Sequence, residues 1–280
     1  MRPDPTSQTL LHWASASDRG RVRPGNEDFA GDPKTLAALA GPEAGLAARG
    51  ALFAVADGMG GHSRGEVASK LAVEVLFTIF YTAPGEPAER FRLAMIAANT
   101  AVRRAGILAE PEMAGLRADA APLRPMGTTL VAAVVLGPWV LFGNVGDSRA
   151  YLLQNGSLEQ VSRDHSYLAE EIRRGIVTEE AAAAALPFRH LITRSMGSRD
   201  DIEVDLFWRP WPPGSTLLLA SDGLHGVVDD ARMAAILASQ PPDVAVRHLV
   251  DTANEAGGPD NVTALVVQSL RPEPRPRSTA

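Results

Sequence analysis

Residues 52–58 read LFAVADG, an apolar run of strand length that ends at an aspartate followed by a glycine. Residues 217–223, LLLASDG, repeat this arrangement, and in residues 258–262, GPDNV, an aspartate comes shortly before an apolar run. Short apolar runs of this kind predict buried strands. Because a buried strand cannot hide a bare carboxylate, we expect each aspartate to lie at a strand end, where another group compensates its charge.

These three aspartates, Asp57, Asp222 and Asp260, indicate a metal site. The chain contains no Cys and only six His residues, so thiolate ligands are excluded and imidazole ligands are few. Hard divalent cations prefer oxygen ligands, and carboxylates are the strongest of them. The sequence therefore predicts an oxygen-rich site for a cation such as Mg²⁺ or Mn²⁺.

The composition favours a single soluble domain. Of the 280 residues, 45% are hydrophobic, which is enough for a substantial core, and no linker divides the chain. The net charge of −6 argues against a nucleic-acid or membrane-surface partner. No apolar run approaches the roughly 20 residues that a transmembrane helix needs, and the polar start at residues 1–10 does not resemble a signal peptide. We therefore expect a cytoplasmic protein.

Two segments near the first aspartate carry further candidate residues. Residues 18–28, DRGRVRPGNED, place Arg23 close to the acidic pair Glu27 and Asp28; the alternative is a solvated loop. His62 follows a glycine-rich turn, a place where the backbone can approach a ligand closely, and it precedes an expected helix. A lone histidine can also be merely structural.

The rest of the chain alternates hairpin and helix signals. The Asn155-Gly156 pair between apolar runs predicts a hairpin. Strands are expected at 13–17, 128–136, 139–145, 150–153, 158–161, 191–194, 202–208, 216–220 and 262–270, and helices at 86–109, 164–186, 229–239 and 242–256. Asp147, in the sequence Gly-Asp-Ser-Arg, is a further candidate ligand. The alternative is that Asp147 is a turn residue paired with Arg149.

Six motifs in a fixed order give a family resemblance. They are SDRGRVRPGNED at 17–28, ADGMGGH at 56–62, MGTT at 126–129, GDSR at 146–149, SDG at 221–223 and GPDNV at 258–262. In this order they resemble the bacterial metal-dependent serine/threonine phosphatases of type 2C, over residues 13–270.

The resemblance implies an α+β fold, a four-layer α/β/β/α sandwich of two antiparallel sheets flanked by helices. The hairpins and helix pairs of the chain agree with it. It also implies one phosphatase domain at 12–270 with a flap subdomain at about 162–203, a loose lead-in at 1–11 and a disordered Pro/Arg tail at 271–280.

The resemblance further implies a set of site residues. Metal ligands by analogy are Asp57, the Gly58 carbonyl, Asp222 and Asp260, with Glu27 and Asp28 holding the water on the ions. Arg23 matches the phosphate-binding arginine, and His62 is the candidate acid for the leaving alkoxide. A third ion would use Asp119 and Asp147, although the residues before MGTT depart from the family pattern. His225 follows Asp222 closely in sequence and is expected to pack rather than to catalyse.

These residue types suit phosphomonoester hydrolysis. Two Mn²⁺ or Mg²⁺ ions clamp the attacking and leaving oxygens and yield a bridging hydroxide, so no protein nucleophile is needed. A guanidinium binds phosphate oxygens bidentately. The expected substrates are phosphoserine and phosphothreonine in proteins, the expected partner is a bacterial serine/threonine kinase that the enzyme opposes, and the expected state is a monomer.

Two other functions remain possible from sequence. The first is a catalytically inactive phosphoprotein-binding module of the same fold, which would be expected to lack at least one ligand. The second is another phosphoesterase, such as a nuclease, against which the acidic charge argues.

Overall fold

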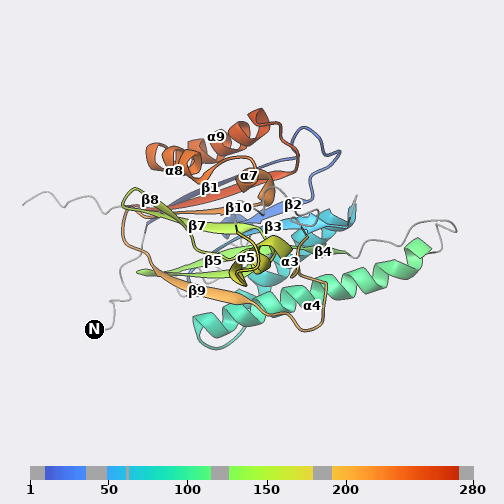
Figure 1. The fold of residues 1–280 in the computed structure, drawn as a ribbon. Helices are drawn as coiled ribbons and strands as arrows, with labels where there is room; N and C mark the ends of the chain where they lie inside the picture. The colour runs from blue at the N-terminus through green and yellow to red at the C-terminus, as the bar shows by residue number, and fades with distance from the viewer. Residues whose placement is uncertain (1–9, 36–48, 61–62, 115–125, 179–190, 271–280) are drawn as a thin grey trace, which may run out of the picture.

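A computed structural model describes residues 10–35, 49–60, 63–114, 126–178 and 191–270. These residues form two antiparallel sheets, each covered by helices on its outer face (Figure 1). The predicted α+β sandwich is confirmed. No helix in these ranges has both the length and the apolar character that crossing a bilayer requires.

The first sheet has the strand order β1-β11-β10-β7-β8. Its strands are β1 (Leu11–Asp18), β11 (Val262–Ser269), β10 (Thr216–Ala220), β7 (Arg149–Gln154) and β8 (Ser157–Gln160). The second sheet has the order β2-β3-β5-β6-β9, and a short strand, β4, also pairs with β3. Its strands are β2 (Asp28–Gly31), β3 (Ala51–Met59), β5 (Leu130–Leu136), β6 (Trp139–Val145), β9 (Asp205–Pro210) and β4 (Gly127–Thr128).

Long helices complete the four layers. Helices α3 (Ser63–Thr82) and α4 (Pro87–Ala114) cover the second sheet, whereas α8 (Asp230–Ser239) and α9 (Pro242–Glu255) cover the first (Figure 1). Two short helices, α5 (Tyr167–Arg173) and α7 (Asp222–His225), lie in the connections. Three apolar clusters fill the three spaces between these layers.

The pleat of the strands explains where the aspartates lie. Phe53 and Val55 of β3 belong to the cluster between the sheets, as do Leu217 and Leu219 of β10. Side chains two apart on a strand share a face, so Asp57 continues the inner row of β3. Carboxylates from the two sheets therefore meet where the space between the sheets ends.

Several element predictions need correction. The helix expected at 164–186 is the short α5, which ends at Arg173 because Gly175 adopts a positive φ of 71°; residues 179–190 lie outside the description. The expected strand at 191–194 is replaced by isolated bridges such as Ser166 to Ile192. Helix α4 continues to Ala114, beyond the predicted end at 109.

Candidate metal centre

Asp28 and Asp57 lie opposite each other on neighbouring strands. They are register partners in the antiparallel pair of β2 and β3, so their side chains project from the same face about 5 Å apart at Cβ. Asp28 is buried, and Ser221 donates a hydrogen bond of 2.7 Å to its Oδ2 atom. The prediction that Asp57 ends its strand is wrong by two residues, because β3 runs on to Met59.

The MGTT motif holds the backbone of Asp57. The Thr129 hydroxyl accepts a hydrogen bond of 2.9 Å from the Asp57 N–H, and the Thr129 N–H donates one of 2.9 Å to the Asp57 carbonyl. The Thr128 hydroxyl donates a second bond, of 2.8 Å, to that carbonyl. Both threonines are fully buried. Three hydrogen bonds therefore fix the main chain of Asp57, from which the carboxylate projects.

Gly58 sits where any side chain would collide with the backbone. A Cβ atom there would lie 2.1 Å from the Gly65 carbonyl oxygen and 2.5 Å from that of Glu27. The Gly58 N–H donates to the Glu27 carbonyl at 3.1 Å, and the Ser69 hydroxyl donates to the same oxygen at 2.6 Å. These contacts bring Glu27 against the first two turns of α3, beside Asp57.

Gly223 brings Asp222 and Asp260 together. A Cβ at Gly223 would lie only 2.0 Å from the Asn261 carbonyl oxygen, so the start of α7 and the residues before β11 are in backbone contact. Asp222 is the first residue of α7, and Asp260 lies two residues before β11. This close approach explains why glycine follows the second aspartate.

Asn261 and Arg23 connect this corner to the N-terminal loop. The Asn261 side chain accepts from the Glu27 N–H at 2.8 Å and donates to the carbonyls of Arg19 (2.9 Å) and Gly25 (2.8 Å). Arg23, which is exposed, donates from Nη2 to Asp260 Oδ2 at 2.6 Å. The structure thus places the predicted phosphate-binding cation directly at a predicted ligand.

Asp147 lies beside the same carboxylates, on the turn between β6 and β7. The alternative pairing with Arg149 is not observed, because Arg149 donates to Asp164 at 2.7 Å. His225 contacts this turn instead: its Nε2 lies 3.0 Å from the Asp147 carbonyl oxygen. Burial lowers the pKa of His225 to about 3, so the neutral ring donates this bond. The expected packing role of His225 agrees with this contact.

Burial raises the pKa of three of the carboxylates, and neighbouring carboxylates raise it further. Burial, followed by Asp28, Asp222 and Asp147, raises the pKa of Asp57 well above its usual range. Burial raises the pKa of Asp28 to about 7, with further increases from Asp222 and Asp260. Burial and then Asp222 raise the pKa of Asp147 to about 7. Bringing these groups to full negative charge therefore requires additional positive charge.

The donor set fits a divalent cation. Oδ1 of Asp28 and Oδ1 of Asp147 are buried and have no hydrogen-bond partner among the described residues. Oxygen atoms of this kind are what Mg²⁺ and Mn²⁺ bind. As the side chains stand, no three His, Asp or Glu residues of the described ranges form a ready-made metal cage. In this arrangement Arg23 holds Asp260, and a hydrogen bond with Asp222 contributes to the raised pKa of Asp57.

Two predicted site residues, His62 and Asp119, lie outside the described residues, and so do the predicted tail at 271–280 and most of the lead-in. Sequence reasoning missed Ser221, Thr129 and Asn261 as supports of the carboxylates. It also missed His165, which contacts the turn of Asp147. A signal was available for Asn261, because it adjoins Asp260 and amides often cap turns.

Comparison with known proteins matches this chain to a known family. The family model for protein phosphatase 2C matches residues 43–255. The serine/threonine phosphatase stp of Listeria innocua is 37% identical over 265 residues, covering 92% of this chain and 96% of its own length. The serine/threonine protein phosphatase PstP of Mycobacterium tuberculosis is 35% identical over 260 residues, which cover 92% of this chain and 45% of PstP.

Solved structures agree with the sequence relatives. The crystal structure of the M. tuberculosis phosphatase PstP/Ppp has a TM-score of 0.76 and 33% identity, covering 93% of this chain and 99% of that one. The catalytic domain of PstP in complex with two manganese ions has a TM-score of 0.74 and 32% identity, with 94% and 100% coverage.

Proposed function

Because this chain belongs to the protein phosphatase 2C family and is a metal-dependent protein serine/threonine phosphatase, we propose that it dephosphorylates the target proteins of a bacterial serine/threonine kinase with two Mn²⁺ or Mg²⁺ ions. The manganese-bound structure of its relative PstP supports the number and type of the ions. In this proposal the protein acts in the cytoplasm as a monomer. Residues 162–203 form the flap over the candidate metal centre.

The ligand roles are proposed for the carboxylates that the two sheets bring together. Asp57, Asp222 and Asp260 would hold the ions, together with the Gly58 carbonyl, and Glu27 and Asp28 would hold water on them. Asp147 is the described candidate for a third ion. When bound, such ions supply positive charge to the phosphate oxygens and acidify water. The observation that carries the proposal is the convergence of the carboxylates: Asp28 faces Asp57 across β2 and β3, and Gly223 holds Asp222 against the backbone beside Asp260.

The protein's own groups have separate tasks. The hydrogen bonds of Thr128 and Thr129 fix Asp57, and Ser221 fixes Asp28. Arg23 is exposed at the rim of the site and carries a fixed charge, so its guanidinium is suited to binding the phosphate oxygens of a phosphoserine or phosphothreonine. His62 is proposed to protonate the leaving alkoxide.

A substrate panel tests this function. Purified protein with Mn²⁺ should release phosphate from phosphoserine and phosphothreonine peptides and leave single-stranded DNA intact. Cleavage of DNA without peptide hydrolysis would refute the proposal. Peptides taken from kinase substrates should be hydrolysed with a higher kcat/KM than scrambled peptides with the same phosphorylated residue, and equal values would refute the kinase-opposing role.

A further inference from the structure

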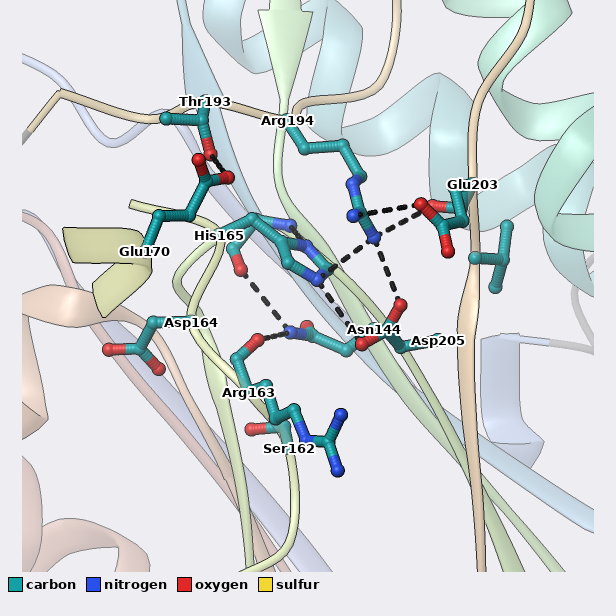
Figure 2. Close-up of polar contacts among 12 residues, drawn as sticks. Asn144, Ser162, Arg163, Asp164, His165, Glu170, Thr193, Arg194, Glu203 and Asp205 are labelled. Atoms are coloured by element: carbon teal, nitrogen blue, oxygen red, sulfur yellow. Dashed lines mark hydrogen bonds and ion pairs between the residues drawn. The ribbon is translucent and has the colours of Figure 1, made fainter. Parts of the chain in front are cut away.

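We propose that His165 is a positioning residue that fixes the turn of Asp147 and ties it to a pocket that receives the phosphoprotein around its phosphorylated residue. The inference rests on the proposed phosphatase function. His165 lies between β8 and α5, and it is 2% exposed. Figure 2 shows its ring at the centre of a group of polar side chains drawn from several segments.

One side of His165 clamps the residue before Asp147. The His165 N–H donates to the Gly146 carbonyl at 2.9 Å, and the Gly146 N–H donates to His165 Nδ1 at 3.0 Å. Gly146 has a φ of 112°, and a Cβ there would lie 2.6 Å from Cβ of Thr129. Thr129 in turn holds Asp57. A displaced Gly146 would therefore disturb both Asp147 and Asp57.

These bonds assign the tautomer of the ring. A backbone N–H can only donate, so Nδ1 must accept, and the ring proton is on Nε2. Nε2 lies 3.5 Å from Asp205 Oδ2. Arg194 Nη1 lies 3.0 Å from Asp205 Oδ1 and 3.0 Å from Nε2 (Figure 2). The hydrogen bond from His165 and then Arg194 lower the pKa of Asp205 to about 2, so its carboxylate is charged and faces both donors.

The other side of this group faces a pocket of about 460 Å³. Its wall contains Thr193 and Arg194, and the Thr193 N–H donates to the His165 carbonyl at 2.8 Å. Other lining residues are Glu170, Ser198, Arg199 and Glu203. Beyond Arg194, Met196 exchanges two backbone hydrogen bonds with Thr128, whose hydroxyl donates to Asp57. Two hydrogen-bonded routes, one through His165 and one through Met196, therefore connect the wall of the pocket to the candidate metal centre.

This arrangement separates the two faces of the ring by function. The Nδ1 face supports the catalytic carboxylates, which every substrate needs. The Nε2–H faces Asp205, whose carboxylate also accepts from Arg194 beside the pocket, and only a peptide substrate is long enough to reach this pocket. A small aryl phosphate therefore reports on the first face alone, whereas a phosphopeptide reports on both.

Two substitutions separate the faces. In His165→Asn, the amide oxygen can replace Nδ1 as the acceptor for Gly146, but the shorter side chain no longer reaches Asp205. In His165→Gln, the longer amide can reach Asp205, but Gly146 loses its acceptor. We expect His165→Asn to keep kcat for aryl phosphate within twofold and to lose about tenfold in kcat/KM for a phosphopeptide. We expect His165→Gln to lose about tenfold in kcat for both substrates.

A control and a second variant complete the test. His248 on α9 also lies between an arginine and an amide, with Arg232 at 3.2 Å and Gln240 at 2.8 Å, so His248→Asn should leave both activities unchanged. Asp205→Asn leaves the bonds to Gly146 in place and should reproduce the peptide-selective loss of His165→Asn, even if substitutions at His165 prevent folding.

Equal losses for the two substrates in His165→Asn and in Asp205→Asn would overturn the inference, because a purely structural histidine would affect both substrates alike. If the wild-type protein hydrolyses both substrates but these variants show no selective loss, the role of His165 is refuted and the proposed phosphatase function stands. Wild-type protein that hydrolyses neither substrate would refute the proposed function and this inference with it.

Discussion

Replacing Gly223 with alanine should separate the two halves of the candidate metal centre. The new methyl group would lie 2.0 Å from the Asn261 carbonyl oxygen, whereas ordinary contacts begin at 3.4 Å. The opposing atom belongs to the backbone beside Asp260, so it cannot turn away as a flexible side chain would. To reach an ordinary contact, the start of α7 and the residues before β11 must move apart by about 1.4 Å, the difference between these two distances.

The expected cost follows from this overlap. Overpacking against a fixed neighbour destabilises proteins by about 1–3 kcal/mol, and we expect the upper end of that range for Gly223→Ala. In a domain of this size, about 3 kcal/mol lowers Tm by about 6–12 °C. A shift of about 1 Å between catalytic groups can cost about 100-fold in rate, so Mn²⁺-dependent kcat should fall by a comparable factor.

Gly25→Ala is the matched control, because a Cβ at Gly25 would have no atom within 4 Å. Urea unfolding and aryl phosphate hydrolysis of the two variants and the wild type measure both effects. A Gly223→Ala protein with wild-type stability and wild-type Mn²⁺ response would refute the claim that Asp222 and Asp260 depend on this backbone contact.

Four further predictions concern single side chains. Asp222→Asn should abolish metal-dependent turnover while far-ultraviolet circular dichroism stays unchanged, and retained activity would remove Asp222 from the ligands. Arg23→Ala should mainly raise KM in steady-state kinetics, because a phosphate-binding cation acts in the ground state too; a fall in kcat alone would contradict this. Ser221→Ala removes the donor to Asp28 and the acceptor of the buried Thr263 N–H. Urea unfolding should therefore show a loss of about 2–4 kcal/mol in the free energy of unfolding. A loss below about 0.5 kcal/mol would contradict this role of Ser221. The pKa of Asp28 is raised to about 7, so the folded state keeps a proton that the unfolded state releases near pH 4. With chelator present, Tm should therefore fall as pH rises from about 4 to about 7. Asp28→Asn should flatten this dependence of Tm on pH.

Much of the fold could be predicted from apolar patterns. Strands β3 and β10 are continuous apolar runs, and the Asn-Gly turn between β7 and β8 was recognisable, because these signals are local. The helix predicted from residue 164 stops early for a physical reason: Gly175 adopts a positive φ, and α5 ends at Arg173. Local propensity did not indicate how far each helix extends.

The carboxylates of the candidate site were predictable, but their supports were not. Asp57, Asp222 and Asp260 stand next to apolar runs, whereas the contact of Ser221 with Asp28 joins residues 193 positions apart. His165 is a similar case, because its partners Gly146 and Asp205 come from β-strand ends far along the chain. Such contacts depend on strand register, which single-residue patterns do not contain.

The most direct test of the whole account is hydrolysis of a small aryl phosphate by purified protein with Mn²⁺, with Mg²⁺ and with a chelator. We predict turnover that requires a divalent ion and disappears when the chelator is added. Hydrolysis that persists in excess chelator, or a folded protein that is inactive with either ion, would contradict the assignment of the aspartate cluster as the catalytic metal centre.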